Sequence, residues 1–340
     1  MATRKEVADM AGVSEATVSR VMNGVGPIRE STRQKVLEAA QTLNYHMNAI
    51  ASSFARGRSG NLGVVIPHVP KVRLFSTYYF SEMMSGIGEA ARAHGCGLLL
   101  LYRDPAVPYD YVSLFRTQRI DGCLVLGANS LPSETTGIAA MAEAGLPFCL
   151  IDQSFDDPGV SAVVAAHETG SYHAVSHLIE SGFGRIGFLN GAPQYSTSAD
   201  RLAGYRRALE ESGIGFDPGL LYEGNYSMRS GQAAAAAVFA DREKLDAVFV
   251  ANDRMAIGLL QGLRERGCET PEDMRIVGYD DSDASRISDP PLTTVKVPFY
   301  EMGLTAADML LERIPGWSAG ASVFRRTMPT ELVVRKSSAK

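Results

Sequence analysis

The chain has 340 residues, of which 45% are apolar and 21% are charged, and its net charge is -5. This length is too great for one ordinary hydrophobic core, and this composition excludes a disordered or fibrous protein. The apolar runs are much shorter than the roughly 18 residues that a membrane-spanning helix needs, and residues 1–10 lack the apolar stretch of an export signal. We therefore expect a soluble, cytoplasmic protein of two or three domains that does not contact a membrane.

The charge is divided unevenly along the chain. Residues 1–60 hold eight Lys and Arg against five Asp and Glu, a net +3, so the other 280 residues carry -8. A basic segment in an acidic chain is typical of contact with nucleic acid phosphates. The amino-terminal end is therefore the predicted phosphate-binding part.

Residues 5–23, KEVADMAGVSEATVSRVMN, predict two short helices joined at Gly12. We expect Ser14 to cap the second helix and to leave its first turn exposed. This arrangement is typical of a helix-turn-helix, whose second helix reads base edges, although an ordinary helical hairpin has the same pattern. The small apolar residues that would join the helices are Val7, Ala8, Ala11, Val13, Val18 and Val21.

Two further helices are predicted before residue 60. The first would open with a capping box of Ser31 and Gln34. The second, over residues 48–56 with Asn48 as its cap, is too short to be stable alone in water, so we expect it to fold only against a partner such as DNA. The predicted core stripe of the first comprises Val36, Leu37, Ala40 and Leu43.

From residue 62 onward, apolar strands alternate with helical stretches. This alternation predicts parallel sheets covered on both faces, and two sheets fit the length better than one. The predicted strands are 62–66, 97–102, 122–126, 148–151, 186–190, 247–251 and 275–279, and the predicted helices are 79–94, 169–181, 199–212 and 253–266.

Polar side chains directly follow three of these strands. They are Asp152, Asn252 and Asp280. Ligands of parallel α/β sheets bind at the carboxyl ends of the strands, so a shared cleft is one interpretation. The alternative for each is a helix or turn cap, which is the role that we expect for Asp253.

Three motifs carry a resemblance to a known family. AGVSEATVSRVMNG, STRQKVLEAAQTLNY and NAIASSFARGRS occur in this order, and the chain closely resembles the LacI/GalR family of bacterial regulators over nearly its whole length. The resemblance implies an N-terminal all-α helix-turn-helix head and an α/β, bilobal effector domain like a periplasmic binding protein, with two doubly wound parallel sheets.

The resemblance also implies the domain boundaries. The head would comprise residues 1–46, a hinge helix and linker residues 47–60, and the effector-binding and dimerisation domain residues 61–340. Within the last, we expect one subdomain at about 61–160 and 292–320 and the other at about 161–291 and 321–340.

The family's base-reading positions fall on Glu15, Ala16 and Arg20. Glu accepts from cytosine N4, Ala contacts the thymine methyl group, and Arg pairs with guanine O6 and N7. Glu15 also lies in the first helical turn, where stabilisation of the helix dipole is the alternative role. The positions that match the family's phosphate contacts are Thr3, Ser14, Thr17, Ser19, Asn23, Thr32, Tyr45 and Asn48.

The linker departs from the family pattern at Phe54, which stands where the family has a Leu. The resemblance implies that this side chain wedges into the minor groove at the operator centre, and Phe is also a known wedge. The alternative is a Phe that packs on the effector domain.

Matching motifs in the second half imply the effector site. SADRLAGYRRAL places Arg201, VANDRMAIG places Asn252 and VGYDDSD places Asp280. Together with Asp152, forked and carboxylate groups of this kind bind vicinal hydroxyls, and aromatic faces cover a sugar ring, so a sugar is favoured over a purine. The aromatic residues that match effector-stacking positions are Tyr79, Phe80, Tyr226 and Phe299.

The resulting prediction is a sequence-specific transcriptional regulator, a repressor of carbohydrate-utilisation genes. It would bind a pseudo-palindromic operator as a homodimer and respond allosterically to a small sugar or sugar-derived effector between two lobes. An exported sugar receptor shares the two-lobed part but lacks a basic helical head. A dinucleotide enzyme is disfavoured because Gly182, Gly184 and Gly187 follow a helix and precede a strand, the reverse of that motif. No catalytic residue, cofactor or metal is predicted, and Cys96, Cys123, Cys149 and Cys268 lack zinc-type spacing.

Overall fold

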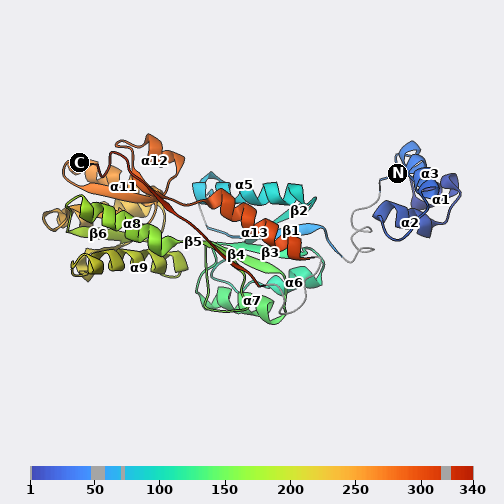
Figure 1. Ribbon diagram of the computed structural model, residues 1–340, viewed down its shortest axis with the longest axis horizontal. Helices are drawn as coiled ribbons and strands as arrows, with labels where there is room; N and C mark the ends of the chain where they lie inside the picture. Colours follow the sequence, from blue (N-terminus) through green and yellow to red (C-terminus); the bar gives the residue numbers. More distant parts are fainter. Residues whose placement is uncertain (1, 47–57, 70–72, 315–322, 340) are drawn as a thin grey trace. The chain divides into compact units, whose positions relative to one another are not determined.

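The computed structural model describes residues 2–46, 58–69, 73–314 and 323–339 (Figure 1). Two compact units are present. One is Met1–Asn61 with Leu114–Asp121, and the other is Leu62–Ser113 with Gly122–Lys340. In the described residues, no helix is both long enough and apolar enough to cross a membrane.

The helical head of the first unit contains α1 (Arg4–Ala11), α2 (Glu15–Asn23) and α3 (Glu30–Thr42). Gly12 ends α1 in the left-handed conformation, with φ of 66°, which a residue with a Cβ adopts only at a cost. This glycine is what lets α2 begin three residues later. The buried residues that join the three helices are Val7, Ala8, Val18, Val21, Val36, Ala39 and Ala40.

Two predictions for α3 are wrong. The helix begins at Glu30 after Arg29, which provides no side-chain cap, so Ser31 and Gln34 do not form a capping box. Leu37 is 42% exposed rather than part of the core. At 100° per residue, Leu37 points away from the face that Val36, Ala39 and Ala40 bury against α1 and α2.

The second unit consists of two lobes, each built on a six-stranded sheet. The strand order in the first lobe is β11-β5-β4-β3-β1-β2. Its strands are β1 (Asn61–Pro67), β2 (Gly97–Arg103), β3 (Gly122–Leu126), β4 (Phe148–Ile151), β5 (Ala162–Ala165) and β11 (Arg325–Met328), and its helices are η1 (Leu74–Ser76), α5 (Tyr78–Ala93), α6 (Tyr111–Arg116), α7 (Pro132–Glu143) and α13 (Phe299–Arg313).

The sheet of the second lobe has the order β12-β10-β9-β8-β6-β7; β12 pairs with β10 in antiparallel fashion, and the other pairs of the described residues are parallel. Its strands are β6 (Ile186–Asn190), β7 (Leu221–Glu223), β8 (Ala247–Val250), β9 (Arg275–Asp280), β10 (Thr293–Lys296) and β12 (Glu331–Val333). Its helices are α8 (His167–Glu180), α9 (Ser196–Glu211), η2 (Pro218–Leu220), α10 (Met228–Ala240), η3 (Arg242–Lys244), α11 (Asp253–Arg264) and α12 (Asp283–Ile287).

The points at which the chain passes between the lobes differ from the predicted subdomain boundaries. β5 and β11 belong to the first sheet and β10 belongs to the second, whereas the predicted boundaries placed each in the other lobe. Each of these short strands follows a predicted boundary by a few residues, and the chain crosses to the other lobe only after the strand ends.

Close helix packing fixes the layer of α5 and α13 on the first sheet. A Cβ at Gly86 would lie 2.0 Å from the carbonyl oxygen of Tyr300, and one at Gly303 would lie 2.3 Å from that of Met83. Each helix therefore presents a glycine to the backbone of the other. Figure 1 shows these two helices side by side over the first sheet.

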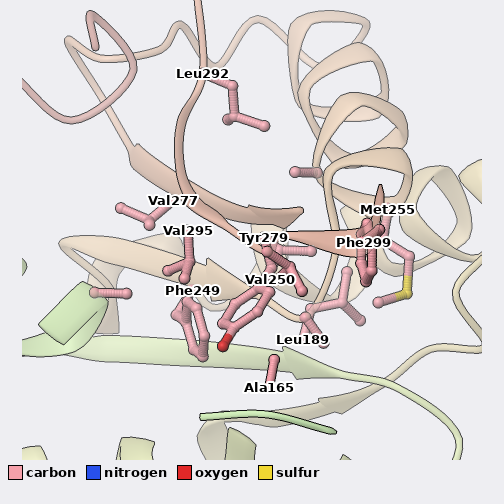
Figure 2. Packing of buried hydrophobic residues seen from close by; sticks show 14 of the residues in the cluster. Ala165, Leu189, Phe249, Val250, Met255, Val277, Tyr279, Leu292, Val295 and Phe299 are labelled. Carbon is pink, nitrogen blue, oxygen red and sulfur yellow. The ribbon is translucent and has the colours of Figure 1, made fainter. Parts of the chain in front are cut away.

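The core of the second lobe continues to the end of the sheet that faces the first lobe. Phe188 and Phe249 stack with ring centroids 4.8 Å apart, and Phe249 lies 6.2 Å from Tyr279. Figure 2 shows Tyr279 among these apolar side chains, with its hydroxyl directed toward Ala165 of β5. Apolar packing thus holds a polar group at the edge of the sheet.

Candidate functional sites

The first turn of α2 is an exposed, capped helix start. Ser14 is extended, and its Oγ accepts from the backbone N–H of Thr17 at 3.2 Å. The cap holds the turn in register while Glu15, Ala16 and Arg20 are exposed to solvent. The three predicted base readers therefore lie on the accessible side of the helix, while Val18 and Val21 hold its other side in the core of the head.

The predicted phosphate contacts lie at helix starts, as Thr3 and Ser14 do, and also at or beyond helix ends, as Asn23 and Tyr45 do. Thr3 caps α1 in a capping box with Glu6, and Asn23 donates from Nδ2 to the carbonyl oxygen of Ser19 at 2.8 Å. Thr17, Thr32 and Tyr45 are half-buried, whereas Thr3 and Ser14 are exposed. Asn48 and Phe54 lie outside the described residues.

Strained backbone marks the strand ends that face the space between the lobes. Asp152 follows β4 with φ of 64°, and Asp280 ends β9 with φ of 112°. Left-handed conformations of this kind are unfavourable for residues with a side chain, and they are found mostly at functional sites. Both predicted carboxylates thus occupy positions that only a strong local constraint maintains.

A buried polar network connects these strand ends. His167, at the start of α8, lies 2.7 Å through Nε2 from Oδ1 of Asp152, and its Nδ1 lies 3.3 Å from the hydroxyl of Tyr279. The Tyr279 hydroxyl also donates to the carbonyl oxygen of His167 at 3.2 Å. Asp152 belongs to the first lobe and His167 to the second, so this pair joins the lobes.

Arg201 lies at the centre of the network and is 3% exposed. Its Nη1 donates to the carbonyl oxygen of Ala251 at 2.7 Å, and its guanidinium carbon lies 4.1 Å from the ring centroid of Tyr279. Burial alone would lower its pKa, but Tyr226, Tyr279 and nearby carboxylates outweigh this effect and raise it. The group is therefore a permanent buried cation.

Asp280, the last residue of β9, is 8% exposed, and Arg201 is one of the charged groups that act on its pKa. Burial raises the pKa of its carboxyl group well above the usual range, the nearby carboxylates of Asp253 and Asp152 raise it further, and Arg201 opposes the shift. Arg201 and Asp280 are therefore two buried polar groups of the second lobe that influence each other electrostatically.

Asn252 and Asp253 have roles that differ from those expected. Asn252, not Asp253, is the N-cap of α11, since its Oδ1 accepts from the N–H of Met255 at 2.9 Å. Its Nδ2 also donates to the carbonyl oxygen of Tyr226 at 3.2 Å, which leaves one amide hydrogen for a ligand. Asp253 is fully buried and accepts from Ser282 and Thr294, and burial raises its pKa to about 6.

Two groups of predicted aromatic residues lie on opposite lobes. Tyr79 contacts Phe80 and Phe299 edge to face, with centroids 4.8 and 5.1 Å away. In the second lobe, Tyr226 has φ of 64° and its hydroxyl lies 2.6 Å from Oγ of Ser198. A Cβ at Gly191 would lie 2.0 Å from the Tyr226 ring, so the glycine makes room for this side chain.

Several residues beside the strand-end network were not found from the sequence. Gln153 accepts from the backbone N–H of Ser196 at 2.9 Å, and the N–H of Ser154 donates to Oγ of Ser196 at 3.0 Å. These contacts join the segment after β4 to the start of α9, so they link the lobes beside the site. The nearest sequence signal is their position directly after Asp152 and directly before the SADR motif.

The first lobe contributes a buried ion pair that was also missed. Arg103, at the end of β2, is 2.5 Å through Nη1 from Oε2 of Glu134, and its Nη2 donates to the carbonyl oxygen of Gly127. The hydroxyl of Tyr111 donates to the other oxygen of Glu134 at 2.5 Å. These contacts join β2 to α6, to α7 and to the residue that follows β3.

The comparisons with known proteins agree with this two-part arrangement. A family model described as bacterial regulatory proteins, lacI family, matches residues 3–48, and a model of a periplasmic binding protein-like domain matches residues 175–338. The chain is 32% identical to the HTH-type transcriptional repressor PurR of Photobacterium profundum, over 99% of this chain and 98% of that protein. This chain belongs to the LacI family. It is a DNA-binding transcriptional repressor and not an enzyme.

Solved structures of LacI-family members share the whole fold. The Lac repressor dimer bound to operator and the anti-inducer ONPF matches with a TM-score of 0.84 and 28% identity, over 100% of this chain and 99% of that one. The transcriptional regulator CelR in complex with cellobiose matches with a TM-score of 0.73 and 30% identity, over 99% and 100% of the two chains. The helix-turn-helix head and the two-lobed α/β domain predicted from the sequence are both confirmed.

Proposed function

We propose that this LacI-family repressor binds a pseudo-palindromic operator as a homodimer and is controlled by a sugar or sugar-derived effector that binds between its two lobes. The observation that carries the effector part is the buried polar network of Asp152, His167, Tyr279 and Arg201, with the buried Asp280 directly after Tyr279 in β9. Its target genes would then be those of carbohydrate use.

Operator recognition is assigned to α2. Its first turn is exposed and capped, and Glu15, Ala16 and Arg20 offer an acceptor, a methyl group and a forked donor on that accessible side. These groups match cytosine, thymine and guanine in the major groove. The neighbouring polar side chains Thr3, Ser14 and Thr17 would fix the register by contacting phosphates.

The chemistry of the cleft supports a polyhydroxylated ligand. Arg201 is a buried cation with its Nε lacking a hydrogen-bond partner among the described residues, and Asp280 is a buried carboxyl group with a raised pKa. Hydroxyl groups of a ligand can form hydrogen bonds with these buried side chains, which replace the bonds to water that the side chains lose on burial. The rings of Tyr226 and of the Tyr79 group would cover the apolar face of a sugar.

A purine is the second candidate. Curated relatives at 31–32% identity are named PurR, and aromatic rings stack on purines as well as on sugars. The solved relatives that point to sugars are a complex with cellobiose and a LacI-family regulator with bound ribose. The buried carboxylates of Asp152 and Asp280 suit hydroxyl groups, which is why we favour the sugar.

The homodimer would pair through the lobes. Large apolar side chains are exposed on the edge strand β2 and on α12: Tyr102 is 51% and Ile287 is 86% exposed. Exposed apolar residues of this kind are typical of protein interfaces. A second copy of the chain is the proposed occupant, and pairing would place two recognition helices for two half-sites.

Control would follow from a change in lobe angle. An effector that binds one arrangement of the lobes more tightly shifts the balance between arrangements, and a near-complete switch needs about 5.5 kcal/mol of differential affinity. The proposed hinge helix over residues 48–56, with Phe54 as a minor-groove wedge, would transmit the change to the operator.

Two measurements test the proposal. A thermal-shift panel of sugars and purines identifies the ligand, because binding at 100 times Kd adds about 2.7 kcal/mol of stability. Gel shifts on a selected duplex, with and without that ligand, then test operator control. If only purines raise the melting temperature, the effector is a purine and not a sugar. If the protein selects no duplex by sequence, the proposal of operator binding is wrong.

A further inference from the structure

The exposed base reader Glu15 forms an ion pair with the first turn of α1. Nε of Arg4 lies 3.0 Å from Oε2 of Glu15, and the two side chains are 51% and 46% exposed. The other carboxylate near Arg4, that of Glu6, is occupied by Thr3, whose backbone N–H and hydroxyl both donate to it. Arg4 therefore pairs across the helix-turn-helix and not within its own helix.

This pair changes what Glu15 offers to DNA. An isolated carboxylate on a helix that enters the groove is repelled by the phosphates, and Arg4 neutralises it. One carboxylate oxygen is engaged by Nε, so Oε1 is the free acceptor and the side chain has fewer rotamers to lose on binding. A carboxylate acceptor in the major groove matches the N4 donor of cytosine.

We infer that Arg4 is a positioning residue for base recognition, and that Glu15 selects cytosine at one position of each half-site only while Arg4 holds it. The inference rests on the proposed function of α2 as the recognition helix. It adds to the base-reading surface a residue of α1 that no motif identified.

The test uses the full-length chain and a duplex selected by the wild-type protein from a random library. The position to be tested is the one at which Glu15→Gln loses the base preference of the wild type. Dissociation constants are measured for the selected duplex and for the three duplexes that differ from it by a single base pair at this position. The wild type should prefer cytosine by about tenfold or more. Arg4→Met should lose this preference as Glu15→Gln does, and the double variant should lose no more.

Two controls separate positioning from general charge loss. Lys5→Met removes one positive charge from the same exposed turn of α1, and it should weaken binding to all four duplexes equally. Arg4→Lys keeps the charge but lacks the planar fork, so it should restore overall affinity more than base preference. Circular dichroism should show the same helical content in every variant, because the Arg4–Glu15 pair is half-exposed.

The outcomes are distinguishable. If Arg4→Met keeps the full cytosine preference and only weakens binding uniformly, Arg4 is a phosphate contact and the inference is wrong. If Glu15→Gln alters no base preference, Glu15 is not a reader and the inference is also wrong. If the wild type selects no duplex at all, it is the proposed operator binding that fails.

Discussion

Replacement of Arg201 by Met should destabilise the second lobe and abolish the effector response together. Met keeps most of the length of the side chain but removes its charge. The variant loses the hydrogen bond from Nη1 to Ala251 and the stacking of the guanidinium over Tyr279. A hydrogen bond from a charged group contributes about 1.5–3 kcal/mol, and a desolvated cation–π contact contributes about 2 kcal/mol.

The expected loss is therefore about 3–5 kcal/mol in the free energy of unfolding. Removal of the cation also takes away the largest of the influences that lower the pKa of the Asp280 carboxyl group, so this pKa should rise further. Urea denaturation at neutral pH measures the loss in the free energy of unfolding. The thermal-shift panel measures the effector response, and no sugar should raise the melting temperature of Arg201→Met.

Arg206→Met is the matched control. Arg206 lies on the same helix with its guanidinium carbon 4.3 Å from the ring centroid of Phe216, but it is exposed and makes no contact with the strand-end cluster among the interactions of the described residues. Its loss should cost about 1 kcal/mol or less and leave the effector response intact. Equal stability of the two variants, with an unchanged sugar response in Arg201→Met, would refute the role assigned to Arg201.

Three further perturbations test other parts of the structure. The pKa of Asp253 is raised from 3.8 to about 6, so its contribution to stability is fully present below pH 3.8 and is lost as the pH rises through 6. The free energy of unfolding of Asp253→Asn relative to that of the wild type should therefore grow by about 3 kcal/mol between pH 3.8 and pH 7. A difference that stays constant with pH in urea denaturation would contradict this. Gly86→Val would force α5 and α13 apart, since even a Cβ at this position lies 2.0 Å from a carbonyl oxygen. The free energy of unfolding should fall by at least about 1–3 kcal/mol in urea denaturation. A denaturation midpoint equal to that of the wild type would argue against this packing. Ile287→Lys should lower the dimer fraction in light scattering at micromolar concentration without changing the circular dichroism spectrum, and an unaltered mass would remove α12 from the proposed interface.

The elements that the sequence predicts well are those with a complete local signal. The helix-turn-helix has its turn at Gly12, its cap at Ser14 and a small apolar face, and all three are present. The wholly apolar strands β3 and β4 match their predicted ranges. The strands β7, β10, β11 and β12 have only three or four residues each and include polar ones, so neither an apolar run nor a period of two distinguishes them from loop sequence.

The candidate site was predictable only in part. Ligands of parallel α/β sheets bind at the carboxyl ends of the strands, and this rule led to Asp152 and Asp280. The partners His167 and Gln153 were not found because their roles depend on segments brought together by the crossing between lobes. Asn252 illustrates the same limit: its cap to Met255 is a local contact, whereas its bond to Tyr226 depends on the fold.

The most direct test of the central claim is a fluorescence-anisotropy titration of the wild-type protein at one fixed, moderate salt concentration. The titration uses the selected duplex and a scrambled duplex, each with and without the sugar that gives the largest thermal shift. The account predicts at least about 10³-fold tighter binding to the selected duplex and a change of about fivefold or more in its Kd when the sugar is present. Equal affinity for both duplexes, or a Kd that no stabilising ligand changes, would contradict it.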